Sequence, residues 1–217
     1  MRFDSRPAAA WVNSLFVDHA VFRMIWTNLA EVIPGRWYRA NHPTPGRIGR
    51  LVARHGIRTI VNLRGSRNCG SDALSRDAAA RLGLDHVYMA FESRGAPHRE
   101  RILRFHAIWR QVKTPVLMHC KSGADRAGLM SALYSHTKLG QPIEIAAKQL
   151  SLRYGHIRQA DTGILDHFFE EYLRFNAATP MPFWNWVDTV YEPEAVTKSF
   201  QANGAASRIL SGLLRRE

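Results

Sequence analysis

Hydrophobic and polar residues follow two different spacings along this chain. Short apolar runs bounded by polar or glycine residues predict strands within 33–43 and at 58–64, 85–91 and 115–120. Apolar positions about 3.6 residues apart predict helices over 45–56, 71–83, 98–112, 126–139, 142–154 and 162–176. Strands that alternate with helices are typical of a central, mostly parallel sheet flanked by helices. The spacing therefore predicts the α/β fold class, and the order of the strands stays open.

The beginning of the chain carries one long helical pattern. On a helical wheel, a single apolar stripe contains Trp11, Leu15, Phe22, Trp26 and Leu29. This stripe predicts an amphipathic helix over 9–31, and we assign 1–34 to an N-terminal amphipathic helical extension. We expect the helix to pack on the body of the protein, with contact to a membrane surface as the alternative.

The end of the chain differs in composition from the middle. Residues 179–194 are rich in proline and aromatic residues. The last helical pattern has an apolar face and basic neighbours, formed by Ile209, Leu210, Leu213 and Leu214 beside Arg208, Arg215 and Arg216. We assign 179–217 to a C-terminal aromatic and basic helical extension and 35–178 to one central domain. A docked C-terminal helix is expected, and a basic amphipathic contact to a membrane or a partner is the alternative.

Composition narrows the setting in which the protein works. A chain of 217 residues with 46% hydrophobic residues can bury one substantial core. Because Cys69 and Cys120 are its two cysteines, a disulfide framework does not hold the fold together, and a reducing compartment such as the cytoplasm is favoured. The start lacks a signal-peptide core, and charged residues interrupt the apolar-rich stretch 11–33, so neither secretion nor a membrane span is indicated.

The charge balance favours acidic partners. Thirty basic residues against eighteen acidic ones give a net charge of +12. Such a surplus suits phosphorylated molecules, anionic lipid headgroups or nucleic acid, although a general arginine bias of the genome would produce it as well. No nucleic-acid recognition motif is present, so specific nucleic-acid binding is not expected. Peripheral contact with an anionic membrane stays open.

The stretch "VLMHCKSGADRAGLMSAL", residues 116–133, combines a strand end, a tight turn and a helix start. The backbone N–H groups of such a loop, together with the N-terminus of the following helix, form a cradle for an anion. The same field would stabilise Cys120 as a thiolate, and Arg126, six positions later, can bind two phosphoryl oxygens with its planar fork. Gly123 permits a positive φ, and Gly128 permits close packing of the first helical turn.

The sequence "HCKSGADRAG" resembles the HCxxGxxR(S/T)G signature of the cysteine-dependent protein tyrosine and dual-specificity phosphatase superfamily. A weaker likeness to the compact dual-specificity type runs from the strand "TIVNLR" to the helix at 162–176, about half of the chain. The resemblance implies a phosphatase domain at 35–178 that works without metal or cofactor. It implies attack by Cys120, protonation of the leaving oxygen by a general acid and release of phosphate by water. The implied phosphate-binding residues are Lys121, Ser122, Gly123, Ala124, Arg126, Ala127 and Gly128.

Two positions depart from the family pattern. Ala127 stands where the family usually has Ser or Thr, whose hydroxyl helps the sulfur to leave. Three alternatives follow for the release of phosphate from Cys120: another hydroxyl or a water assists it, it is slow, or the protein only binds phosphate. The family's usual aspartate on an earlier loop is missing, because "FESRGAP" offers Glu92 instead. Asp125 resembles the GxDR loops of myotubularin-like lipid phosphatases and of bacterial phosphatases for phosphotyrosine and phosphoinositides. We favour Asp125 as the acid, ahead of Glu92 and Asp85.

Further residues are expected to support the site. His119 can order the loop, Lys121 can meet a second phosphate, and Arg64, Arg67 and Arg94 can extend a basic mouth. A reversible disulfide between Cys69 and Cys120 is a less favoured alternative. The expected substrates are phosphotyrosine in proteins or lipid and inositol phosphates. A catalytically weak or inactive phosphate-binding module is the alternative function.

Overall fold

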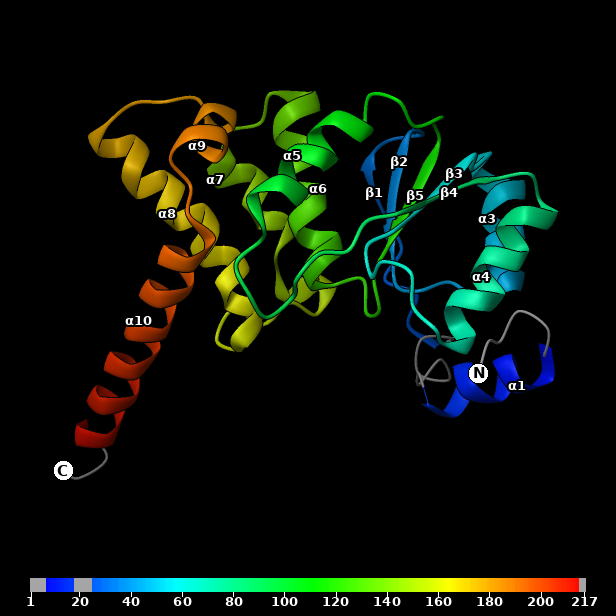
Figure 1. The fold of residues 1–217 in the computed structure, drawn as a ribbon, viewed down its shortest axis with the longest axis horizontal. Helices are drawn as coiled ribbons and strands as arrows, with labels where there is room; N and C mark the ends of the chain where they lie inside the picture. Colours follow the sequence, from blue (N-terminus) through cyan, green and yellow to red (C-terminus); the bar gives the residue numbers. More distant parts are fainter. Residues whose placement is uncertain (1–6, 18–24, 215–217) are drawn as a thin grey trace.

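The computed structural model describes residues 7–17 and 25–214 (Figure 1). Within them, a five-stranded sheet has the order β1-β2-β5-β3-β4. Its strands are β1 Ala30–Ile33, β2 Trp37–Ala40, β3 Thr59–Asn62, β4 Asp85–Tyr88 and β5 Val116–His119. β1 pairs antiparallel with β2, whereas β2, β5, β3 and β4 are parallel. The predicted α/β fold with a mostly parallel sheet is confirmed.

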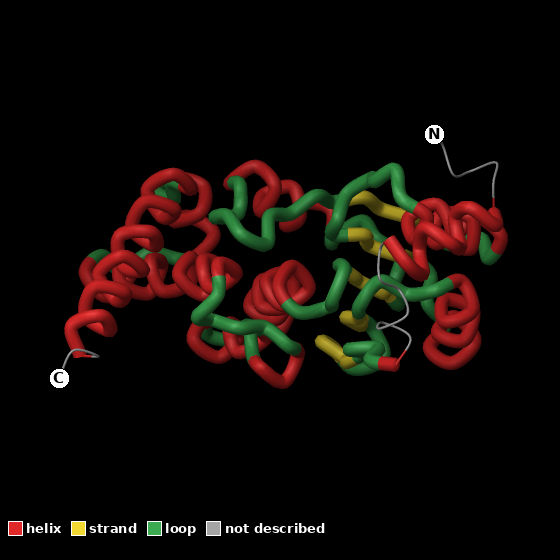
Figure 2. Tube along the Cα trace, turned by 90° about the horizontal axis from the view of Figure 1, so that it is seen from below, coloured by secondary structure: helices red, strands yellow, loops and turns green. Residues whose placement is uncertain are grey.

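Helices cover both faces of this sheet (Figures 1 and 2). On one side lie α3 Pro45–His55 and α4 Gly70–Arg81, and on the other lie α5 Arg99–Ile108, α6 Asp125–Leu139, α7 Ile143–Ala146 and α8 Ile164–Ala178. Successive strand residues point to opposite faces. Accordingly, Leu117 packs in one cluster with Leu51 of α3, while its neighbours Val116 and Met118 join the larger core that includes Leu129 of α6. Burial on both faces explains why Val116, Leu117 and Met118 of the central strand are all apolar.

The helix predicted over 142–154 is wrong in its second half. α7 ends at Ala146, and two 3-10 turns follow, η2 Ala147–Gln149 and η3 Leu152–Tyr154. The irregular backbone turns two carbonyl oxygens away from a helical ladder. The carbonyl of Gln149 accepts from Arg39, and that of Tyr154 accepts from Asn28. These tertiary hydrogen bonds therefore replace the helix that the spacing favours.

The N-terminal segment packs on α4, as expected, over the residues that the structure describes. α1 Pro7–Val12 continues into the π-helical turn η1 Asn13–Val17, and the Asn13 side chain accepts a 2.8 Å hydrogen bond from the N–H of Gly70. The predicted helix over 9–31 is wrong at its end, because Asn28 has φ +49° and Ala30–Ile33 is strand β1. Residues 18–24, with Phe22 of the apolar stripe, lie outside the described residues.

The C-terminal segment is joined to the main core. After α9 Phe183–Thr189 comes α10 Pro193–Leu214, whose first turns dock on α8 through a 2.7 Å hydrogen bond between His167 Nε2 and Ser199 Oγ. Phe183, Trp186 and Tyr191 are buried in the same core as α8. The predicted basic and apolar face around Arg208 to Arg216 lies outside the described side chains.

The later part of α10 extends beyond the rest of the molecule (Figures 1 and 2). Among the helices that the structure describes, none combines the length and the apolar character that crossing a membrane requires. The domain boundaries at residues 34 and 178 remain predictions.

Candidate active site

The loop from Cys120 to α6 follows β5, the middle strand of the sheet. Gly123 has φ +78°, and a Cβ there would lie 2.7 Å from the Asn41 nitrogen and 2.8 Å from the Ala40 carbonyl carbon. Both the backbone angle and the contact with β2 therefore require glycine. A Cβ on Gly128 would lie 2.7 Å from a side-chain carbon of Leu150, so α6 also begins in close contact with its neighbour.

The carbonyl oxygens of residues 121–124 all accept hydrogen bonds from outside the loop. The donors are the backbone N–H of His42, the side-chain amide of Asn28 and the guanidinium of Arg39, at distances of 2.8 to 3.2 Å. With its carbonyls held outward, the loop can turn N–H groups toward its centre. One of them, on Gly123, donates to Cys120 Sγ at 3.2 Å.

Arg39 is the functional residue that the sequence analysis missed most clearly. It lies on β2, is fully buried, and donates from Nη1 to the carbonyl and side-chain oxygens of Gln149, both at 2.8 Å. Its guanidinium also lies 3.9 Å from the ring centre of Tyr154. Burial lowers the pKa of Arg39 to about 10, and the nearby Tyr154, Cys120 and Asp125 oppose that shift. The sequence feature that could have indicated Arg39 is its position as a single arginine inside the apolar strand "WYRA".

Cys120 and Arg126 lie within electrostatic reach of each other, at the loop that follows β5 and at the start of α6. Cys120 is 1% exposed. Burial lowers the pKa of Arg126, and the neighbouring Cys120 thiol opposes that shift. The charges of Arg64 and Arg67 also act on Arg126, so the predicted basic mouth includes both. Arg126 Nε is buried and has no hydrogen-bond partner within the described residues, which leaves a donor for an anion.

His119 ends β5, directly before Cys120, and its ring is buried. Its ring packs edge-on against His42, with ring centres 4.4 Å apart, and neither ring nitrogen has a partner at hydrogen-bonding geometry among the described residues. Burial and the nearby His42 hold the pKa of His119 well below its usual range, so the ring is neutral. His42 donates from Nε2 to the Ser71 carbonyl and accepts from Arg64 at Nδ1, at 3.0 and 3.1 Å. Arg64 is thereby fixed beside the loop.

The three acid candidates lie in different places. Asp125 begins α6, next to Arg126, and its Oδ1 lies 2.8 Å from His156 Nδ1. Glu92 lies in the β4–α5 loop and pairs with Arg101 and with His98 of the α5 start. Arg94, in the same loop, is exposed.

Asp85 is excluded from the site by the strand register. It aligns with Thr59, which aligns with Val116 at the start of β5. Asp85 therefore lies at the end of the sheet opposite to Cys120, and it pairs there with Lys113 at 3.1 Å.

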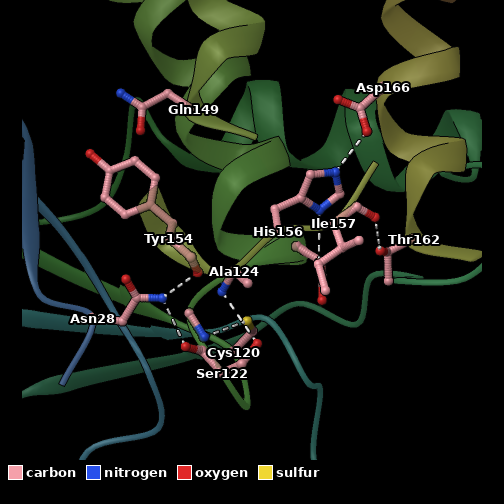
Figure 3. Close-up of polar contacts among 12 residues, drawn as sticks. Asn28, Cys120, Ser122, Ala124, Gln149, Tyr154, His156, Ile157, Thr162 and Asp166 are labelled. Atoms are coloured by element: carbon pink, nitrogen blue, oxygen red, sulfur yellow. Dashed lines mark hydrogen bonds and ion pairs between the residues drawn. The ribbon is translucent and has the colours of Figure 1, made fainter. Parts of the chain in front are cut away.

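Ala127 leaves its place in the loop apolar. It is fully buried, and the Ser131 hydroxyl one turn later donates to the Ala127 carbonyl at 2.6 Å. In the loop itself, the Ser122 hydroxyl accepts from the Ala124 N–H at 3.3 Å (Figure 3). Lys121 is exposed at the loop, and Cys69 and Cys120 are both free thiols.

His156 is a second residue that the sequence analysis did not single out. It is buried and lies between two carboxylates, Asp125 and Asp166, whose oxygens are 2.8 and 2.7 Å from its ring nitrogens. Although burial opposes the charged form, the hydrogen bonds to Asp125 and Asp166 raise the pKa of His156 to about 9. Nothing in the spacing around "YGHIR" indicates this contact.

The fold and the cysteine loop together define a phosphatase of the protein tyrosine and dual-specificity type, a phosphoric monoester hydrolase. The family model described as "DSP-PTPase phosphatase fused to NAD+ Kinase" matches residues 34–163, which is more than half of the chain. The chain therefore belongs to this family, and the resemblance seen in the sequence is confirmed. A search of curated proteins finds no match.

Solved structures share the fold at low sequence identity. TpbA of P. aeruginosa is 19% identical with a TM-score of 0.53, over 70% of this chain and 92% of that one. The core catalytic domain of the S. cerevisiae PP-IP phosphatase SIW14 is 14% identical with a TM-score of 0.50, over 70% and 91%. PTPMT1 is 16% identical with a TM-score of 0.50, over 70% and 99%. These similarities support the dual-specificity-type fold.

Proposed function

We propose that this chain hydrolyses phosphomonoesters through a phosphocysteine intermediate on Cys120. The observation that carries the proposal is the 3.2 Å hydrogen bond from the Gly123 N–H to Cys120 Sγ, in a loop whose carbonyls are held outward. N–H groups around a sulfur favour the thiolate, and they also stabilise the phosphoryl oxygens of the transition state.

The roles of the other residues follow from their positions. The Cys120 thiolate attacks phosphorus, so that an S–P bond forms as the bond to the leaving oxygen breaks. Asp125 gives its proton to that oxygen. In the second step Asp125 accepts a proton from water, water oxygen bonds to phosphorus, and the thiolate leaves. Arg126 and the loop N–H groups bind the remaining phosphoryl oxygens throughout.

The substrate class is phosphotyrosine in proteins or a lipid or inositol phosphate. One solved structure shows a TpbA variant in complex with pTyr, and SIW14 is a PP-IP phosphatase. Arg64 and Arg67 act electrostatically on Arg126, and Lys121 lies exposed on the loop. This surplus of cations favours a substrate with several negative charges. Cytoplasmic location and contact with an anionic membrane remain predictions.

Ala127 favours a second candidate, a phosphate-binding module with weak or no turnover. The buried methyl group offers no hydroxyl to the sulfur when phosphate leaves. The first function predicts release of phosphate, whereas the second predicts binding of a phosphate analogue alone.

The test is phosphate release in the presence of a metal chelator. Substrates are a phosphotyrosine peptide, phosphoinositides and phosphatidylglycerophosphate in vesicles, and the variants are Cys120→Ser and, as the matched control, Cys69→Ser. We expect turnover by the wild type and by Cys69→Ser and none by Cys120→Ser. Tungstate binding without release from any substrate would support the binding module instead. Release by Cys120→Ser at the wild-type rate would overturn the assignment of the nucleophile.

A further inference from the structure

His156 joins the start of α6 to the first turn of α8. Its side chain is 1% exposed. Nδ1 lies 2.8 Å from Asp125 Oδ1, and Nε2 lies 2.7 Å from Asp166 Oδ2; Figure 3 shows the second contact. Because both partners are carboxylate oxygens, each ring nitrogen donates a proton, and the ring is an imidazolium.

The groups that face the ring are Asp125 from α6 and Asp166 from α8, and both favour its charged form. The cluster has a net negative charge when both carboxyl groups are ionised and is neutral when Asp125 carries the proton for the leaving oxygen. Arg39 and Arg126 both feel the charge of Asp125. The cluster is therefore electrostatically part of the site.

We propose that His156 is the positioning residue for Asp125 in the phosphatase reaction. The inference rests on the proposed function. Asp125 Oδ1 is occupied by His156, whereas Oδ2 has no hydrogen bond within the described part of the chain. His156 thus fixes the orientation of the carboxyl group and leaves Oδ2 to carry the proton for the leaving oxygen. The imidazolium keeps both of its protons throughout and stabilises the carboxylate that forms when Asp125 gives its proton away.

The same segment also holds the opposite side of the loop. Two residues before His156, the Tyr154 carbonyl accepts from Asn28 at 2.8 Å, and the Tyr154 ring lies against Arg39. Asn28 and Arg39 donate to the carbonyls of residues 122–124 of the loop. A single short segment therefore contacts both the residue that carries the proton and the residues that shape the phosphate cradle.

Two amide variants separate the two hydrogen bonds of His156. His156→Asn retains an N–H donor near the position of Nδ1, toward Asp125, and His156→Gln retains one near Nε2, toward Asp166. Both remove the charge. A general acid contributes about 10²–10⁴-fold to rate, so its misplacement by His156→Gln should lower kcat/KM on an alkyl phosphate by about tenfold or more, because kcat/KM reports the step in which the leaving group departs. His156→Asn should lose clearly less on that substrate.

Leaving-group dependence distinguishes positioning from a structural role. An aryl phosphate with an acidic phenol hardly needs the proton, so its kcat/KM should fall less than about threefold in His156→Gln. His167→Gln is the matched control, since His167 is a buried histidine of α8 held by Ser199 and Glu171. We expect it to lower thermal stability without changing the ratio of the two substrates.

The comparison of alkyl with aryl phosphates tests the positioning role of His156 separately from the phosphatase function. The expected result is an aryl-to-alkyl ratio of kcat/KM that rises most in His156→Gln and is unchanged in His167→Gln, with tungstate affinity kept. An active wild type with equal losses on both substrates in His156→Asn and His156→Gln would overturn the positioning role and leave the phosphatase function standing. A wild type that releases no phosphate from either substrate would overturn the phosphatase function, and the positioning role with it.

Discussion

Arg39 Nη2 lies 2.8 Å from the carbonyl oxygen of Gly123, so a buried cation on β2 holds the turn that follows β5. The two strands are parallel neighbours, and Ala40 aligns with His119 directly before the cysteine. The shape of the phosphate cradle thus depends on the adjacent strand as well as on the loop sequence.

Replacing Arg39 should damage the loop more than the core. Arg39→Met keeps an apolar stem but leaves the carbonyls of Gly123 and Gln149 without this donor, whereas the Ala124 carbonyl still accepts from the Gly128 N–H. Each buried acceptor left unpaired costs about 1–3 kcal/mol, so urea unfolding should show a loss of at least about 2 kcal/mol. Tungstate affinity should fall as well. Arg36→Met, at an exposed position three residues earlier, is the control, and equal effects of both variants would contradict this role.

Gly123→Ala should remove anion binding through a steric conflict with β2. The new Cβ would lie 2.7 Å from the Asn41 nitrogen at a φ of +78°. Gly140→Ala is the matched control, because Gly140 has φ +62° and open space around its Cβ position. The control should lose about 1 kcal/mol of unfolding free energy from backbone strain alone. Gly123→Ala should lose more, together with tungstate binding; retention of that binding would show that the loop tolerates a side chain.

Ala127→Ser should speed the second half of the reaction. A hydroxyl at this buried position of the first α6 turn can donate to the departing sulfur, as the family's usual Ser or Thr does. In rapid-quench kinetics, the phosphoenzyme should accumulate less, and steady-state kcat should rise several-fold toward about tenfold, the effect of about 1.4 kcal/mol in the barrier. An unchanged burst would mean that another group already serves the sulfur.

The His156 cluster should make stability depend on pH on the alkaline side. Hydrogen bonds to Asp125 and Asp166 raise the pKa of His156 to about 9 in the folded state, against an ordinary value of 6.5. A raised folded-state pKa gives stabilisation that is complete below about pH 6.5 and is lost as pH rises through about 9. The difference corresponds to at most about 3 kcal/mol. Urea unfolding between pH 6 and 9.5 should show this decline in the wild type and a weaker one in His156→Asn; parallel curves would refute it.

The sequence located the loop because its parts are contiguous. Cys120, Gly123 and Arg126 lie on one turn between a strand and a helix, and the alternation of strands and helices sets that turn on the central strand. Residues that reach the site from distant segments of the chain have no characteristic spacing from the loop in the sequence. Arg39 is 84 residues from Gly123, and His156 is 31 residues from Asp125, so only tertiary contacts unite them.

The wrong helix over 9–31 has a related cause. Its apolar stripe has helical spacing, yet Asn28 adopts a positive φ and donates to the Ser122 and Tyr154 carbonyls. Pairing of β1 with β2 then provides hydrogen-bond partners for the backbone N–H and C=O groups that a helix would otherwise have paired. Tertiary hydrogen bonds overrule local periodicity at this point.

The central claim is that Cys120 carries the phosphoryl group during turnover. The most direct measurement is to mix the protein with a phosphorylated substrate, quench it in acid within the first turnover, digest it and map the phosphoryl group by mass spectrometry. We expect a phosphorylated peptide containing Cys120 in the wild type and in Cys69→Ser, and none in Cys120→Ser. Phosphate release by the wild type with the phosphoryl group on another residue, or undiminished release by Cys120→Ser, would contradict it.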